Sequence, residues 1–126
     1  MLTYTLYGPP RTKKNSQQIR RTAAGRPFVA PSKAFAAYER SCLAQIKPPY
    51  RPVSAAVNVK CVYYMPTKRR VDLTNLLEAT DDILVKAGVL ADDCAAVVAA
   101  HDGSRVLLDR ENPRVEIEVT EMEDKT

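Results

Sequence analysis

Residues 57–65, with the sequence VNVKCVYYM, decide the fold class of this chain. Val57, Val59 and Cys61 alternate with polar residues, and this period of two is typical of a β-strand with one buried face. Pro66 ends the strand, because proline has no backbone N–H to give to a neighbouring strand. The stretch therefore predicts a strand that places one apolar face against a core.

A helix is predicted after this strand, from about Thr74 to Ala87. Leu76 and Ile83 fall on one side of it at about 3.6 residues per turn, and Gly88 stands in the usual position just past a helix end. The opposite side carries Asn75, Glu78 and Asp82. The helix is therefore expected to bury one side and to present the other, polar side.

The remaining sequence predicts more strands and one more helix. Strands are expected at residues 2–7, 28–30, 96–100 (a buried strand), 105–108 and 115–120. Ser32 is a suitable cap for a helix that runs to about Ile46 and buries Phe35, Tyr38 and Cys42 with it. We therefore expect one domain of the α+β class, residues 1–126, with a mixed β-sheet and two main helices.

The composition argues against a membrane or secreted protein. With 45% hydrophobic and 27% charged residues, the chain resembles ordinary globular proteins, and no apolar run approaches the ~20 residues that span a bilayer. The N-terminus lacks the layout of a signal peptide, and the three cysteines form no C-x-x-C pair. We expect a cytoplasmic protein with no membrane partner.

The net charge of +4 hides an uneven distribution. Residues 1–71 hold fourteen Lys or Arg and one acid, a balance of +13, whereas residues 72–126 hold five Lys or Arg and fourteen acids, a balance of −9. A half that is almost free of acids suits a polyphosphate partner. Within it, the polar, basic residues 11–26 form a long stretch that favours a functional or partly mobile loop. An equally good interpretation is that the two halves pair their charges with each other.

Two acidic motifs flank the second predicted helix. Asp72 follows the basic run Lys68–Arg70, and Asp92-Asp93 comes soon after Gly88. Carboxylates of this kind hold Mg²⁺ for phosphodiester hydrolysis, and neighbouring Lys and Arg residues bind phosphates. A helix of about fourteen residues spans about 20 Å, so the motifs meet only if the chain doubles back or a second subunit supplies one. The alternative is that these residues are a helix cap and a solvated turn.

The order and spacing of several motifs resemble those of the RusA-type Holliday-junction resolvases, a family of crossover junction endodeoxyribonucleases. The motifs are Pro9-Pro10 with Asn15, Val29–Ser32 with Ala37-Tyr38, Met65-Pro66 with Lys68–Arg70, Asp72–Leu76, Lys86–Gly88 with Asp92-Asp93, and Arg114–Met122. Among these, Asp72–Leu76 is similar to the family's D-x-D-N-L signature. The resemblance covers nearly the whole chain.

The resemblance implies a RusA-like fold and a homodimer that binds branched DNA, namely four-way junctions, and nicks two strands symmetrically during recombination and repair. It also implies dependence on Mg²⁺, with Mn²⁺ as a substitute, and an association with prophages. The family's catalytic aspartates carry over to Asp72 and Asp93. Two positions depart from the pattern, because the second aspartate of the signature is Thr74 here and the helix lysine falls at Glu78.

Glu78 offers a partial repair of this altered site. Residues four apart on a helix are neighbours, and helical side chains lean toward the N-terminus, so Glu78 can supply a carboxylate beside Thr74. Asp82, one turn further on, is a weaker candidate. The expected catalytic and metal-binding residues are therefore Asp72, Asp93 and Glu78, whereas His101 is expected to be structural or solvent-facing.

Phosphate contacts are expected from eight basic residues: Arg11, Lys13, Lys14, Arg20, Arg21, Lys68, Arg69 and Arg70. Such contacts give salt-dependent affinity without base specificity. One alternative function is a non-catalytic branched-DNA-binding protein of the same fold, in which Thr74 and Glu78 record a degraded metal site. Another is an interaction protein whose acidic and basic halves pair with each other or with a neighbouring subunit.

Overall fold

A computed structural model describes residues 1–13 and 17–122. In chain order the elements are β1 (Leu2–Tyr7), β2 (Gln17–Arg21), β3 (Pro27–Pro31), α1 (Lys33–Gln45), β4 (Val57–Met65), α2 (Leu73–Lys86), β5 (Val98–Ala100), β6 (Arg105–Leu108) and β7 (Arg114–Glu121). They form a mixed five-stranded sheet with two helices and a separate hairpin, which confirms the expected α+β class. No helix within the described residues is long and apolar enough to cross a bilayer.

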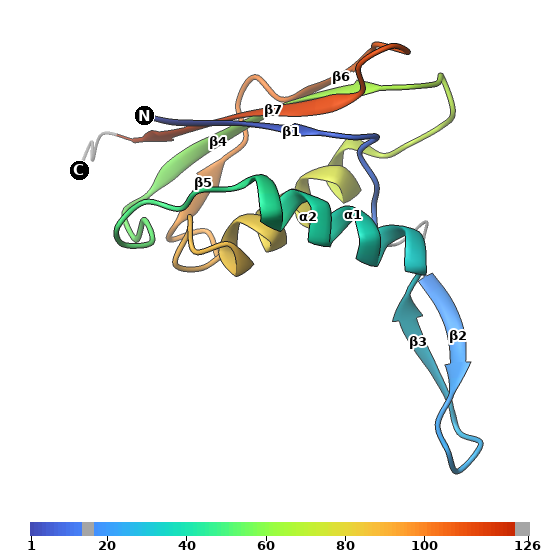
Figure 1. The fold of residues 1–126 in the computed structure, drawn as a ribbon. Helices are drawn as coiled ribbons and strands as arrows, with labels where there is room; N and C mark the ends of the chain where they lie inside the picture. Colours follow the sequence, from blue (N-terminus) through green and yellow to red (C-terminus); the bar gives the residue numbers. More distant parts are fainter. Residues whose placement is uncertain (14–16, 123–126) are drawn as a thin grey trace.

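Strand β4 is the centre of the sheet. It pairs antiparallel with β7, which lies between β4 and β1, and it pairs parallel with β5 and β6 on its other side. Parallel neighbours need a crossover connection, and α2 provides it between β4 and β5 (Figure 1). The helix that follows β4 is thereby placed against the sheet and beside the β5–β6 edge.

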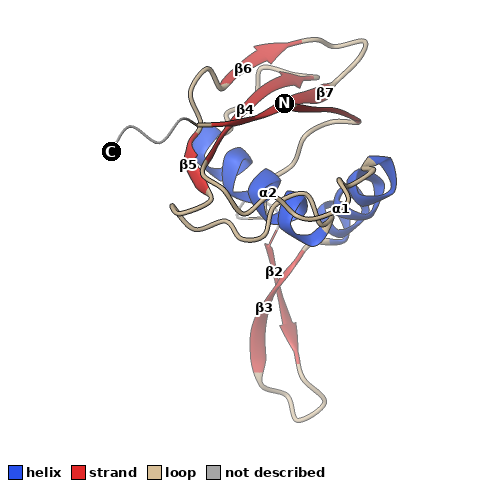
Figure 2. Ribbon diagram, turned by 90° about the vertical axis from the view of Figure 1, so that its left-hand side faces the viewer, coloured by secondary structure: helices blue, strands red, loops and turns tan. Residues whose placement is uncertain are grey.

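The core lies on one face of the sheet, the face that α1 and α2 cover (Figures 1 and 2). Val59, Cys61 and Tyr63 of β4 are fully buried and alternate with partly exposed residues, as their sequence pattern predicts. Ile117 and Val115 of β7 stand opposite Cys61 and Tyr63 in the register, so the same alternation continues across the strands. The other face keeps polar side chains, as antiparallel sheets commonly do.

Helix α1 begins and packs as its sequence predicts. Ser32 is its N-cap, and the Ser32 hydroxyl accepts a hydrogen bond of 3.1 Å from the backbone N–H of Phe35. Phe35, Tyr38, Cys42 and Ile46 are all buried. A small polar cap followed by an apolar stripe is therefore enough to place this helix on the sheet.

The basic stretch between β1 and α1 differs from the expected loop. Residues 17–21 form β2, which pairs antiparallel with β3 in a hairpin that projects from the body of the molecule (Figures 1 and 2). The turn is closed by a 2.9 Å hydrogen bond from Gly25 N–H to the Thr22 carbonyl, with Gly25 at φ +82°. The sequence QQIRR has one apolar residue, so it lacks the alternation that identifies strands with a buried face.

Strand β5 is shorter and more exposed than expected. Residues 94–97 form a turn, in which the Val97 and Val98 amides both donate to the Cys94 carbonyl at 3.0 and 2.8 Å. Only Val98–Ala100 remain for pairing with β4, and Ala99 is exposed. The prediction of a buried strand over residues 96–100 was therefore wrong at its start and in its burial, because the turn uses backbone groups that a longer strand needs.

Candidate active site

Two turns of α2 and two later loops line an open acidic pocket of about 280 Å³. Its lining residues are Thr74, Leu77, Glu78, Asp81, Asp93 and His101. The chain doubles back after α2, because Gly88 adopts φ +81° and the next two amides, of Val89 and Leu90, donate back to the Leu84 carbonyl at 2.9 and 3.3 Å. This reversal returns Asp93 to the helix, so Glu78 and Asp93 share one pocket.

Asp72 lies just before this pocket rather than among its lining residues. It is the N-cap residue of α2, yet its side chain makes no capping hydrogen bond. Its carboxylate is half exposed, accepts a 3.4 Å hydrogen bond from the Asn75 side chain, and lies 3.8 Å from the Arg70 Nε. Asp72 therefore stands at the start of the helix without a side-chain capping bond, and its carboxylate faces Arg70 of the preceding loop.

The pocket presents the carboxylates of Glu78, Asp81 and Asp93. Carboxylate oxygens are the ligands that Mg²⁺ prefers in proteins. One of them, Oδ1 of Asp81, is buried and has no hydrogen-bond partner among the described residues. Within that same part of the chain, no three His, Cys, Asp or Glu side chains stand close enough together to hold one metal ion. The residues thus fit a hard cation by their chemistry, and binding one requires their side chains to move toward a common point.

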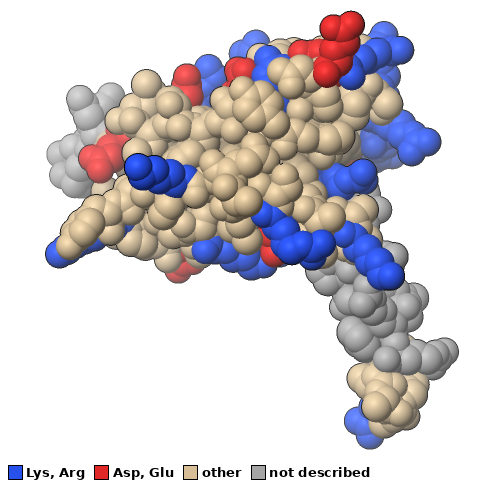
Figure 3. Space-filling view, viewed as in Figure 1, with Lys and Arg blue, Asp and Glu red and all other residues tan. Residues whose placement is uncertain are grey.

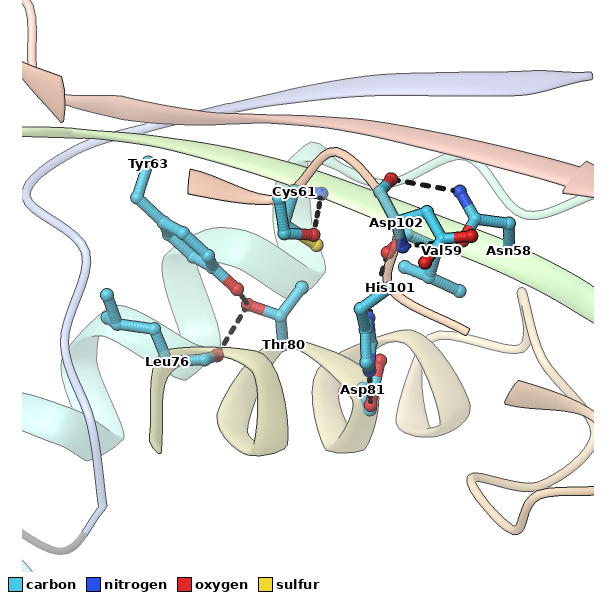
Figure 4. Close-up of polar contacts among 10 residues, drawn as sticks. Asn58, Val59, Cys61, Tyr63, Leu76, Thr80, Asp81, His101 and Asp102 are labelled. Carbon is cyan, nitrogen blue, oxygen red and sulfur yellow. Dashed lines mark hydrogen bonds and ion pairs between the residues drawn. The ribbon is translucent and has the colours of Figure 1, made fainter. Parts of the chain in front are cut away.

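His101 is one of the residues that line the pocket, and it contacts α2 and β4 (Figure 4). Its Nε2 lies 2.8 Å from Asp81 Oδ2 on α2, and its Nδ1 lies 2.8 Å from the Val59 carbonyl on β4. The pKa of His101 is raised, first by the hydrogen bond to Asp81, against the lowering effect of burial. His101 is therefore structural, as expected, but it also lines the candidate site, which the sequence did not indicate.

The position of His101 follows from a break in the sheet edge between β5 and β6. At this break, backbone groups of β4 have no neighbouring strand among the described residues to pair with. Side chains take the place of the missing backbone hydrogen-bond partners (Figure 4). The Ser104 hydroxyl accepts from the Cys61 amide at 3.0 Å, and the Asn58 side chain bonds both the amide and the carbonyl of Asp102 at 2.7 and 3.2 Å. His101 satisfies the Val59 carbonyl in the same way, so the irregular edge directs its ring toward α2.

A basic cleft of about 390 Å³ lies next to the entrance of α2. It is lined by the ends of two loops, with Arg11, Arg69 and Arg70 as its charged residues. In the view of Figure 3, Lys and Arg side chains gather along the lower edge and at the right-hand end, where β4 leads toward α2. Three of the eight expected phosphate-binding residues are thus brought together at one surface.

The other five are placed differently. Lys68 is exposed in the same loop but does not line the cleft, Arg20 and Arg21 lie in β2, and Lys14 lies outside the described residues. Lys13 bonds the Asp82 carboxylate and lies 5.8 Å from the centre of the Phe35 ring.

Some charges of the two halves do pair, as the second interpretation of the charge distribution predicts. Besides Lys13 with Asp82, Lys60 lies 3.9 Å from Glu118. Burial raises the pKa of Asp82, but hydrogen bonds from Lys13 and Lys86 outweigh this effect and hold it below its usual value. The weaker metal-site candidate of the sequence is therefore already engaged by two ammonium groups, whereas Arg11 and Arg69 remain at the cleft.

Two residues of the pocket, Asp81 and His101, were missed by the sequence interpretation. Asp81 falls within the apolar side of α2, with buried Leu77 four residues before it and buried Leu84 three residues after it. A carboxylate in a buried stripe needs a partner, and this was the available signal. The partner, His101, is twenty residues away and comes close only through the fold.

Comparison with known proteins identifies a family for this chain. The family model described as Endodeoxyribonuclease RusA matches residues 7–120. A search of curated proteins gave no match. The matched range contains both the basic cleft and the acidic pocket.

Proposed function

The chain belongs to the RusA endodeoxyribonuclease family, and from this premise we propose that it resolves four-way (Holliday) DNA junctions by paired symmetric nicks in DNA recombination and repair. The substrate class is branched DNA. The expected cofactor is Mg²⁺, which Mn²⁺ can replace.

One observation carries the proposal, namely that the basic cleft and the acidic pocket adjoin along a single segment of chain. Arg69 and Arg70 line the cleft, and Glu78 lines the pocket eight residues after Arg70. Asp72, between them in sequence, faces Arg70 across 3.8 Å. A DNA strand held by its phosphates at the arginines would pass beside the carboxylates. This is the division of labour that phosphodiester hydrolysis requires.

Within this proposal Asp72, Glu78 and Asp93 hold the divalent cation. When bound, the cation supplies a more acidic water and neutralises charge that develops on the phosphate. The protein's own groups do the remaining work: Arg11, Arg69 and Arg70 bind the flanking phosphates and orient the strand. An arginine at this cleft also replaces the cation that the family carries where this chain has Glu78.

Paired nicks need two active sites related by a twofold axis, so we propose a homodimer. Sedimentation equilibrium measures this directly, because the dimer has twice the chain mass of 14.0 kDa. A monomer at the concentrations that cleave junctions would contradict paired cleavage by one complex.

The activity is tested with a labelled four-way junction and a linear duplex of the same sequence, each with and without Mg²⁺. We expect two symmetric nicks in the junction, none in the duplex, and none without the metal. Asp93→Asn should abolish cleavage, whereas Asp102→Asn, an exposed aspartate outside the pocket lining, should cleave like the wild type. Glu78→Gln should also lose activity. Salt-dependent junction binding without any cleavage would instead identify a DNA-binding protein with a degraded site.

A further inference from the structure

Asp81 is a charged residue on the buried side of α2. Only 8% of its surface is exposed, and Leu77 and Leu84 beside it on the helix are also buried. A carboxylate in such surroundings loses its hydration and needs other partners. The hydrogen-bond partners of the two carboxylate oxygens of Asp81 therefore indicate its role.

One oxygen is accounted for by His101. The Val59 carbonyl can only accept, so the Nδ1 of His101, 2.8 Å away, must donate to it. Nε2 then faces Oδ2 of Asp81 at 2.8 Å, and with an ionised carboxylate this nitrogen donates as well. Both ring nitrogens are thus occupied, so His101 has none left for a metal or a water molecule. Its influence on the pocket passes through Asp81.

The other oxygen, Oδ1, is buried and has no hydrogen-bond partner among the described residues. Thr74, Glu78 and Asp81 follow each other at steps of four and three, so they lie along one stripe of α2, and all three line the pocket. Helical side chains lean toward the N-terminus, which directs Asp81 toward the turn that carries Glu78. Asp81 therefore lines a pocket with two other carboxylates, and its Oδ1 is the buried oxygen that has no hydrogen-bond partner among the described residues.

We propose that Asp81 is a further ligand of this site, and that its Oδ1 binds the divalent cation together with Glu78 and Asp93. His101 is the positioning residue, because it holds Oδ2 and leaves Oδ1 for the ion. Ligating carboxylates are commonly held by such outer hydrogen bonds. The inference rests on the proposed metal-dependent function and assigns that function a ligand from a different turn of the helix.

The test is the affinity for Mn²⁺ alone, measured from water-proton relaxation, with wild type, Asp81→Asn, Asp93→Asn and Asp82→Asn. The amide in Asp81→Asn keeps the size of the side chain and can still accept from His101, but it puts an NH₂ group where the ion needs an oxygen. We expect Mn²⁺ binding to weaken by more than about 100-fold, beyond the range for outer hydrogen-bond partners. Asp82→Asn, whose carboxylate is bound by Lys13 and Lys86, should retain wild-type affinity.

His101 also reports where the ion sits, because it is the single histidine of the chain. Its Cε1 proton resonance should broaden on adding Mn²⁺ and recover with excess Mg²⁺. Two variants separate its contacts: His101→Asn keeps a donor near the Nδ1 position for Val59, and His101→Gln keeps one near the Nε2 position for Asp81. If His101 positions Asp81, the asparagine variant should bind Mn²⁺ about 10- to 100-fold more weakly, and the glutamine variant should retain most of the affinity.

The outcomes separate the two proposals. Wild type that binds no Mn²⁺ would overturn the metal-dependent function and this inference with it. Wild-type affinity in Asp81→Asn, combined with a loss in Asp93→Asn, would overturn the role of Asp81 alone and leave the function standing. Equal affinities of the two His101 variants would remove the positioning role, because a purely structural histidine predicts no such difference. Thermal unfolding of each variant identifies any loss that comes from misfolding.

Discussion

The hydroxyl of Tyr63 on β4 lies 2.6 Å from the hydroxyl oxygen of Thr80 on α2, and both residues are buried. Thr80 also lies 2.9 Å from the Leu76 carbonyl, which can only accept. Thr80 therefore donates its one hydroxyl proton to Leu76, and Tyr63 donates to Thr80 (Figure 4). This chain of two hydrogen bonds fixes α2 on the sheet at the residue next to Asp81.

The direction of these bonds predicts unequal costs for the two conservative substitutions. Tyr63→Phe removes one hydrogen bond and should lower the free energy of unfolding by about 0.5–1.5 kcal/mol. Thr80→Val removes the hydroxyl that accepts from the buried Tyr63 hydroxyl and should cost about 1–3 kcal/mol. Urea unfolding of both variants measures the difference, and a larger loss in Tyr63→Phe would contradict the assigned direction. The double variant should cost less than the sum of the two.

The Lys13–Asp82 contact predicts a dependence of stability on pH. The pKa of Asp82 is lowered in the folded protein relative to its usual value of 3.8, since the two lysines outweigh the effect of burial. A depressed carboxyl pKa stabilises the fold above the unfolded value, and this contribution is lost as pH falls through the lowered folded value. Unfolding midpoints of wild type and Asp82→Asn should therefore differ at pH 7 and converge as the pH falls through the lowered pKa of Asp82. A constant difference across this range would contradict the account.

The basic cleft predicts a salt effect on DNA binding. Each phosphate contact to duplex DNA contributes a slope of about −0.9 to log K against log salt concentration, so Arg69→Gln should reduce the slope by about that amount. Arg51→Gln, in the loop at the other end of β4, is the matched control and should leave the slope unchanged. Fluorescence anisotropy with a labelled junction at several salt concentrations measures both. Equal slopes in Arg69→Gln and wild type would remove Arg69 from the DNA contact.

The reversal after α2 predicts a backbone effect at Gly88. At φ +81° a Cβ atom is strained, although the nearest atom it would meet, Cβ of Pro48, lies at an ordinary 3.7 Å. Gly88→Ala should therefore cost about 1–2 kcal/mol of stability from the backbone alone, and Gly88→Asn should cost less, because asparagine tolerates this region better. Thermal unfolding of the two variants provides the comparison, and equal stability of wild type and Gly88→Ala would refute it.

Local patterns were sufficient to predict most of the elements. The alternation in residues 57–65, the cap at Ser32 and the glycine after α2 each identify an element from neighbouring residues, and each prediction was confirmed. The hairpin was missed because residues 17–21 carry no apolar alternation. Pairing with residues 27–31 makes these residues a strand, and no local pattern records that pairing.

In the candidate site, too, some residues could be identified from local sequence motifs, whereas the role of others depends on the fold. Glu78 and Asp93 were singled out from motifs, and the structure brings them to one pocket. Asp81 was not singled out from the sequence, because its burial depends on how α2 packs on the sheet. The role of His101 depends on a break between β5 and β6, and only the fold shows that this break faces α2.

The position of β7 also orders events during synthesis of the chain. This strand lies between β1 and β4, so strands from opposite ends of the described fold pair with each other: Leu2 stands opposite Val119 in the register. Such distant pairings form slowly, because closing a long loop costs conformational entropy before the stabilising contacts form. On the ribosome, the apolar faces of β1 and β4 must therefore wait for residues 114–121 to emerge. A nascent chain released before that point would expose two strand edges that can pair with other chains.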